Sequence, residues 1–157
     1  MKVTAWRLVQ AKYAAHAFSG EGARQFGGRW NRKGTALVHA ASSLSLAALE
    51  LLVHLESYQV LQSYRAISAE FDERFCQWLD TEHLPPDWSG FPAAESTKSI
   101  GADWIQQRQS AVLAVPSVLI PIEMNFLINP QHPDFARLKI GEPGEFFYDQ
   151  RLVKVRE

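Results

Sequence analysis

Residues 42–55 read SSLSLAALELLVHL, and this stretch predicts a helix built into the core of the protein. The serines at its start suit an N-cap. Apolar residues at positions 44, 47, 48, 51, 52 and 55 follow the spacing of one buried helix face. Leucine or valine also occupies positions 46, 49 and 53 on the other side. A helix that is apolar all round is typical of a buried one, so we expect this segment to be enclosed.

One carboxylate, Glu50, interrupts this apolar helix. Glutamate is rarely buried without a partner, because an unpaired charge in a dry site is costly. Such a residue is either paired or retained for a chemical purpose, and catalysis is one such purpose. Glu50 is therefore the first candidate for a functional side chain.

The composition indicates an ordinary globular protein. The chain has 157 residues, which suits one domain spanning 1–157, and 46% are hydrophobic and 21% charged. The net charge of −1 gives no sign of a nucleic acid or an anionic membrane as partner. The single cysteine, Cys76, excludes an internal disulfide and fits a cytoplasmic location. The start of the chain lacks the apolar core of a signal peptide, and no apolar run is long enough to span a bilayer.

Alternating patterns outside the helix predict strands at residues 2–9, 36–40, 60–71 and 146–153. A further strand is expected at 111–115, interrupted by Pro116 and continuing over 118–120. The glycine- and arginine-rich segment 19–34 and the proline-containing segment 83–97 read as loops, and 72–79 and 101–109 as short helices. Strands dominate without a regular βαβ rhythm, so the predicted fold class is α+β.

The run Gly27-Gly28-Arg29-Trp30-Asn31 combines groups that suit a ligand. Glycine lets the backbone approach a ligand closely, and the arginine fork matches phosphate or carboxylate. Trp30 adds a stacking surface and Asn31 an amide. A surface turn with a salt-bridged arginine is the plainer interpretation of the same run. The spacing is not that of a dinucleotide-binding fingerprint, so a Rossmann site is not indicated.

Three further positions carry polar groups within apolar surroundings. His39 ends the short strand before the Glu50 helix, and His54 follows Glu50 by one helical turn, where it could orient the carboxylate. Ser117 could be a nucleophile or simply a satisfied core hydroxyl. Asn125 shares a face with Glu123 in the next extended stretch. No third ligand clusters with Glu50 and His54, so we predict no metal site.

Taken in order, these blocks resemble the RES-domain family, named for its Arg, Glu and Ser. The matching words are GGRWN, then SLSLAALELLVH, then VPS followed by EMNFLINPQHP, with Gly101-Ala-Asp-Trp104 just upstream. The three residues of the name resemble Arg29, Glu50 and Ser117. The resemblance covers nearly the whole chain. One position departs from it, since the family usually has a tyrosine where this chain has His39.

The resemblance implies a bacterial toxin of a toxin–antitoxin pair, with an ADP-ribosyltransferase-like mixed or antiparallel β core and flanking helices. It implies that NAD⁺ is consumed as a substrate, without a cofactor, and that an Xre-like antitoxin covers the site. A homodimer is left open by it. In this interpretation Glu50, Arg29 and Ser117 are catalytic, and the substrate is bound by Gly28, Trp30, Asn31, His39 and Asn125.

The chemistry of these residues suits cleavage of the nicotinamide–ribose bond. A carboxylate stabilises a ribosyl oxocarbenium ion, and an arginine holds a pyrophosphate. The acceptor is left open between water, phosphate and a protein side chain. A non-catalytic nucleotide-binding module is the competing class, and in it Glu50 forms a structural ion pair with Arg29.

Overall fold

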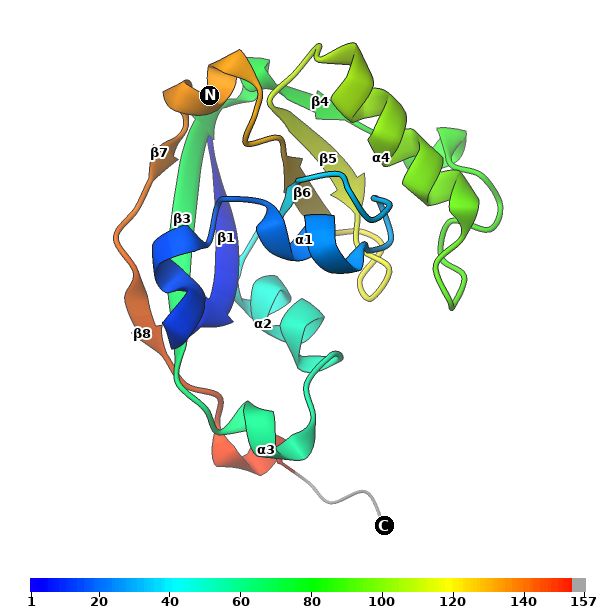
Figure 1. The fold of residues 1–157 in the computed structure, drawn as a ribbon. Helices are drawn as coiled ribbons and strands as arrows, with labels where there is room; N and C mark the ends of the chain where they lie inside the picture. The colour runs from blue at the N-terminus through cyan, green and yellow to red at the C-terminus, as the bar shows by residue number, and fades with distance from the viewer. Residues whose placement is uncertain (154–157) are drawn as a thin grey trace.

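A computed structural model describes residues 1–153 of the chain (Figure 1). The last four residues of the predicted domain lie outside this range. Its strands are β1 (Lys2–Gln10), β2 (Val38–Ala41), β3 (Tyr64–Asp72), β4 (Cys76–Trp78), β5 (Val112–Pro116), β6 (Met124–Ile128), β7 (Lys139–Ile140) and β8 (Gly144–Phe146). Its α-helices are α1 (Glu21–Phe26), α2 (Leu44–Leu52), α3 (Ser57–Val60) and α4 (Glu95–Gln107). Short 3₁₀ helices cover Ala11–His16, Glu73–Phe75, Thr81–His83, Pro133–Arg137 and Gln150–Leu152.

The described strands form a single mixed sheet in the order β4-β5-β6-β2-β1-β3-β7, with β8 also paired to β3. Only the β4–β5 pair is parallel; the other pairs are antiparallel. The parallel pair needs a long crossover, which the segment containing α4 supplies. The predicted α+β fold class is confirmed.

Helices cover the sheet at two places (Figure 1). Helix α2 packs on β1 and β2, where Leu46 and Ala47 join a buried cluster with Leu8 and Tyr64. Helix α4 lies along β5, and its Trp104 packs in a second cluster that holds buried residues of β5 and β6. In the view of Figure 1, α1 lies between these two helices.

The local sequence explains where α2 begins. Ser43 is the N-cap, and its hydroxyl accepts a hydrogen bond from the Leu46 N–H at 3.1 Å. The far end of the chain also holds the helix, because the buried Tyr148 hydroxyl donates to the Ala48 carbonyl at 2.5 Å. Helix α2 is thus fixed by a local cap and by a contact 100 residues away in the sequence.

The prediction that α2 is enclosed on all sides is wrong. Leu46 and Ala47 are buried, but Leu49 is 37% and Val53 55% exposed. The helix packs on β1 and β2 through one side, so only that side meets the core. Leu49 and Val53 are thus left facing solvent on its outer side.

Several predicted elements differ in the structure. The segment 19–34 contains the helix α1, and 72–79 is a 3₁₀ turn followed by β4, which gains its ladder from β5. The strand predicted to resume at 118–120 is a turn, and 146–153 holds only the end of β8 and a 3₁₀ turn. Tertiary pairing and side-chain capping outweigh the local pattern in each case. No helix within residues 1–153 is long and apolar enough to cross a membrane.

Candidate active site

Glu50 is held by two side chains that are distant in sequence. The Ser117 hydroxyl donates to Glu50 Oε1 at 2.6 Å, and Asn125 Nδ2 donates to the same oxygen at 2.8 Å. No donor from residues 1–153 reaches the other carboxylate oxygen, Oε2. One carboxylate oxygen is therefore held by two hydrogen bonds. The other is available to accept a hydrogen bond from a ligand hydroxyl group or to face a positive charge.

Ser117 has no hydrogen-bonding capacity left for a ligand. Its side chain is fully buried, and besides donating to Glu50 its oxygen accepts from the backbone N–H groups of Leu119 and Ile120, each at 3.1 Å. A hydroxyl has one donor and two acceptor positions, and all are used here. The geometry gives no support to Ser117 as a nucleophile and makes it the support of Glu50 and of the turn after β5.

Arg29 lies on the segment between α1 and β2, within electrostatic reach of Glu50. Burial lowers the pKa of Arg29, and the negative charge of Glu50 acts in the opposite direction. The described residues show no salt bridge between the two. Arg29 Nη1 instead donates to the carbonyls of Trp88 at 3.0 Å and Gly90 at 2.8 Å. The ion pair predicted for a non-catalytic module is absent, and Nε and Nη2 of Arg29 have no partner among these residues.

His39 and Asn125 share one face of the sheet. Ala41 of β2 is opposite Asn125 and His39 is opposite Leu127, so residues 39, 41 and 125 lie on the same side. A Cβ added to Gly28 would lie 3.5 Å from His39 Nε2 and 3.0 Å from Asn31 Oδ1, so Gly28 sits directly against the imidazole ring. Burial, with smaller contributions from the positive charges of Arg7 and His54, lowers the pKa of His39 to about 4. His39 is therefore neutral at pH 7.

Two residues predicted to bind substrate have structural positions instead. Trp30 is only 3% exposed and packs in the core cluster with Trp104, so it offers no free face for stacking. Asn31 is fully buried, and its Nδ2 donates to the carbonyls of Ala23, Arg32 and Thr35. These contacts shape the loop that carries Arg29, while Asn31 Oδ1 is buried without a hydrogen-bond partner among the described residues.

His54 does not orient Glu50, contrary to the sequence-based interpretation. It is exposed beyond the end of α2, and its described contacts include no hydrogen bond or salt bridge to Glu50. The sequence predicts a loop over 83–97, but not its contact with Arg29 through the Trp88 and Gly90 carbonyls. No local signal marks this contact, because it is made by backbone carbonyls, which every residue possesses.

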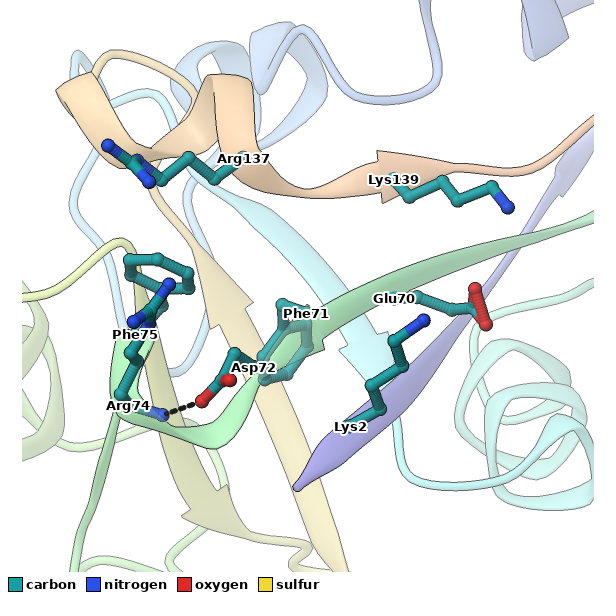
Figure 2. A pocket seen from close by; sticks show the side chains of 8 residues that line it. All are labelled: Lys2, Glu70, Phe71, Asp72, Arg74, Phe75, Arg137 and Lys139. Carbon is teal, nitrogen blue, oxygen red and sulfur yellow. Dashed lines mark hydrogen bonds between the residues drawn. The ribbon is translucent and has the colours of Figure 1, made fainter.

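Two open pockets on the surface of the protein are lined by residues other than Glu50. One of about 330 Å³ is lined by Lys2, Arg74, Arg137, Lys139 and residues of β3 (Figure 2). Lys2 is opposite Asp72 and Lys139 is opposite Glu70 across the strands, so the cavity is a sheet face with complementary charges. Within residues 1–153 no three His, Cys, Asp or Glu side chains gather as metal ligands do.

Fold and site together define an α+β protein in which a glutamate on a helix that packs on a mixed sheet is hydrogen-bonded by a serine and an asparagine, with an arginine nearby. The chain belongs to the RES domain family, whose model matches residues 4–149. The family resemblance predicted from the sequence is confirmed.

Relatives of known name cover almost the whole chain. The "Toxin Res" of Yersinia enterocolitica is 38% identical over 148 residues, covering 94% of this chain and 97% of the relative. The "Prs ADP-ribosylating toxin" of a Sphingobium species is 37% identical over 159 residues, with coverages of 98% and 99%. Among solved structures, a chain of the M. tuberculosis MbcT–MbcA toxin–antitoxin complex shares the fold. It has a TM-score of 0.78 and 18% identity, covering 98% of this chain and 87% of that one.

Proposed function

We propose that this protein is the toxin of a toxin–antitoxin pair and that it cleaves NAD⁺ at the bond between nicotinamide and ribose. The observation that carries the proposal is the Glu50 carboxylate, with Oε1 clamped by Ser117 and Asn125 and Oε2 free. Its membership of the RES family and its two relatives named as toxins support the biological part.

The proposed reaction begins with heterolysis of the C1′–N bond. Nicotinamide leaves as a neutral molecule with the bonding electron pair, so no acid is required. The ribose is left as an oxocarbenium cation, which the fixed negative charge of Glu50 stabilises. Water then adds to C1′ and loses a proton, giving ADP-ribose; phosphate adding instead gives ADP-ribose phosphate.

The surrounding residues bind and orient the dinucleotide in this proposal. Arg29 contacts the pyrophosphate through Nε and Nη2, because only its Nη1 hydrogen-bonds to the Trp88 and Gly90 carbonyls. Gly28 lies directly against His39, whose neutral ring packs or hydrogen-bonds against the nicotinamide ribose in this proposal. Ser117 and Asn125 act as positioning residues, since their polar contacts are directed at Glu50.

ADP-ribosyl transfer to a protein is the second candidate function. It is favoured by one observation, the relative named as a Prs ADP-ribosylating toxin. Both reactions share the first step, and they differ only in the nucleophile that captures C1′. The identity of the acceptor therefore has to come from the products.

The test is to incubate the purified chain with NAD⁺ labelled in the adenosine half and to follow both halves. We expect free nicotinamide, with the label in ADP-ribose or its phosphate. Glu50→Gln should lower the rate at least about 100-fold with an unchanged melting temperature, because it removes the charge but keeps the shape. Glu142→Gln, at an exposed position, is the matched control and should behave as wild type.

The possible outcomes separate the candidates. Label retained on a protein when cell extract is added favours the transferase. If the folded wild type releases no nicotinamide either alone or with extract, the NAD⁺ cleavage proposal is wrong.

The same proposal gives a partner for the exposed side of α2. An antitoxin, expected to be of the Xre-like type, covers the site and buries the apolar Leu49 and Val53 side chains near Glu50. Val53→Lys should leave NAD⁺ cleavage intact but weaken neutralisation by the co-expressed antitoxin. Unchanged neutralisation by that variant would move the predicted interface away from α2.

A further inference from the structure

One aromatic ring near Arg29 is almost entirely exposed. Phe91 has 96% of its surface accessible and directly follows Gly90, whose carbonyl accepts a hydrogen bond from Arg29. A large ring in water gains nothing from folding. Its position beside the arginine of the candidate site points to a role in contacting a ligand.

The loop that carries Phe91 is braced rather than loosely attached. Three residues before it, the Trp88 side chain packs against the buried cluster that includes Trp104, while the Trp88 carbonyl accepts from Arg29. The Ser96 hydroxyl donates to Asp87 Oδ1 at 2.6 Å, and the Gly90 N–H donates to the Asp87 carbonyl at 3.0 Å. These contacts hold the backbone just before Phe91 and tie it to Ser96, so the loop itself need not become ordered when a ligand binds.

We infer that Phe91 forms the stacking platform for the adenine ring of NAD⁺. This inference rests on the proposed function. In the proposed function Glu50 acts at the nicotinamide ribose. Arg29 is within electrostatic reach of Glu50 and hydrogen-bonds to the Gly90 carbonyl, directly before Phe91. A dinucleotide with its pyrophosphate on Arg29 then extends its adenosine half toward Phe91. A flat purine on an exposed phenyl face gains stacking energy without needing specific polar partners.

The test uses ligands that contain only one half of the substrate. ADP-ribose contains adenine and lacks nicotinamide, whereas nicotinamide mononucleotide contains nicotinamide and lacks adenine. Titration calorimetry of the folded protein should show that Phe91→Ala weakens ADP-ribose binding at least about fivefold. The same substitution should leave the affinity for nicotinamide mononucleotide unchanged. Phe91→Tyr should keep the affinity for ADP-ribose near that of the wild type. In turnover, Phe91→Ala should raise KM for NAD⁺ by a similar factor with kcat near wild type.

Phe147→Ala provides the control, because Phe147 is also an exposed phenylalanine, at 60%, and follows β8. Phe147→Ala should change the affinity for neither ADP-ribose nor nicotinamide mononucleotide. Wild-type affinity of Phe91→Ala for ADP-ribose, or a selective loss of nicotinamide mononucleotide, would overturn the adenine assignment. Failure of the proposed reaction has a different signature, namely no nicotinamide release by the wild type while ADP-ribose still binds in a Phe91-dependent way.

Discussion

At the scale of single residues, the site depends on how Glu50 is held rather than on its identity alone. A carboxylate on an isolated helix swings freely, whereas here one oxygen receives two donors from the strand pair β5–β6 and its connecting turn. Such fixed hydrogen bonds preorganise the charge, so that no reorganisation is needed as a cation develops. The serine of the family name thereby gains a physical role as the support of the glutamate.

Ser117→Ala tests this role. Glu50 loses a donor and two backbone N–H groups lose their acceptor, so we expect a stability loss of about 1–2 kcal/mol. With Glu50 displaced, kcat for NAD⁺ cleavage should fall about 10- to 100-fold while KM stays near wild type. Chemical denaturation and steady-state kinetics measure the two effects. Ser110→Ala, at another buried serine with its own hydrogen bonds, should lose stability but keep kcat. A complete loss of activity in Ser117→Ala would indicate direct participation instead.

His39 makes stability depend on pH. Folding lowers its pKa from 6.5 to about 4, chiefly by burial, so between these values the unfolded chain binds the additional proton. The stability contributed by neutral His39 is fully present above about pH 6.5 and is lost as the pH falls toward 4. From pH 7 to pH 4.5 the wild type should lose about 2 kcal/mol more unfolding free energy than His39→Gln. Urea titrations at both pH values measure this, with exposed His16→Gln as control; equal losses in the wild type and His39→Gln would refute it.

At the scale of elements, α2 combines a local start with a position set by the rest of the fold. Ser43 caps the helix through its own hydroxyl, whereas the neighbouring Ser42 is exposed and forms no described side-chain hydrogen bond. The two serines are alike in sequence context and differ only in geometry. The cap therefore offers a clean measure of how much the start of α2 contributes.

Ser43→Ala should destabilise the protein by about 1 kcal/mol, which corresponds to roughly 2–4 °C in melting temperature for a chain of this size. Ser42→Ala should have almost no effect. Thermal unfolding followed by circular dichroism is the measurement. Equal shifts for the two variants would mean that the cap assignment is wrong.

At the scale of the whole molecule, the segment carrying Arg29 is fastened to α4. The Thr97 hydroxyl donates to the Arg29 carbonyl at 2.6 Å, and Arg32 contacts Glu95 and Ser99 of the same helix. Gly101 of α4 allows this close packing, because its Cα faces the Trp30 backbone with no space for a side chain. The position of Arg29 relative to Glu50 is thus set by the packing of α4.

Gly101→Ala should disrupt the packing of α4 against the segment that carries Arg29 and Trp30. An ideal Cβ at Gly101 would lie 1.6 Å from the Trp30 carbonyl oxygen, so the helix and the segment must separate. We expect a loss of at least about 3 kcal/mol in unfolding free energy. Gly22→Ala, in α1 with open space around its Cβ position, should be neutral or slightly stabilising. Denaturant midpoints of the two variants provide the comparison, and similar midpoints would contradict the described packing.

What the sequence determined by itself is local: the long strand β1, the helix around Glu50, the serine N-cap of that helix, and the family motifs that contain Arg29, Glu50 and Ser117. These depend on neighbouring residues and on short motifs. Tertiary structure alone decided that Trp30 and Asn31 are structural, that one side of α2 faces solvent, and that Glu50 binds Ser117 and Asn125 rather than Arg29 or His54. The physical reason is that these contacts join residues as far as 75 positions apart, and strand register and turn geometry, not local pattern, bring them within hydrogen-bond distance.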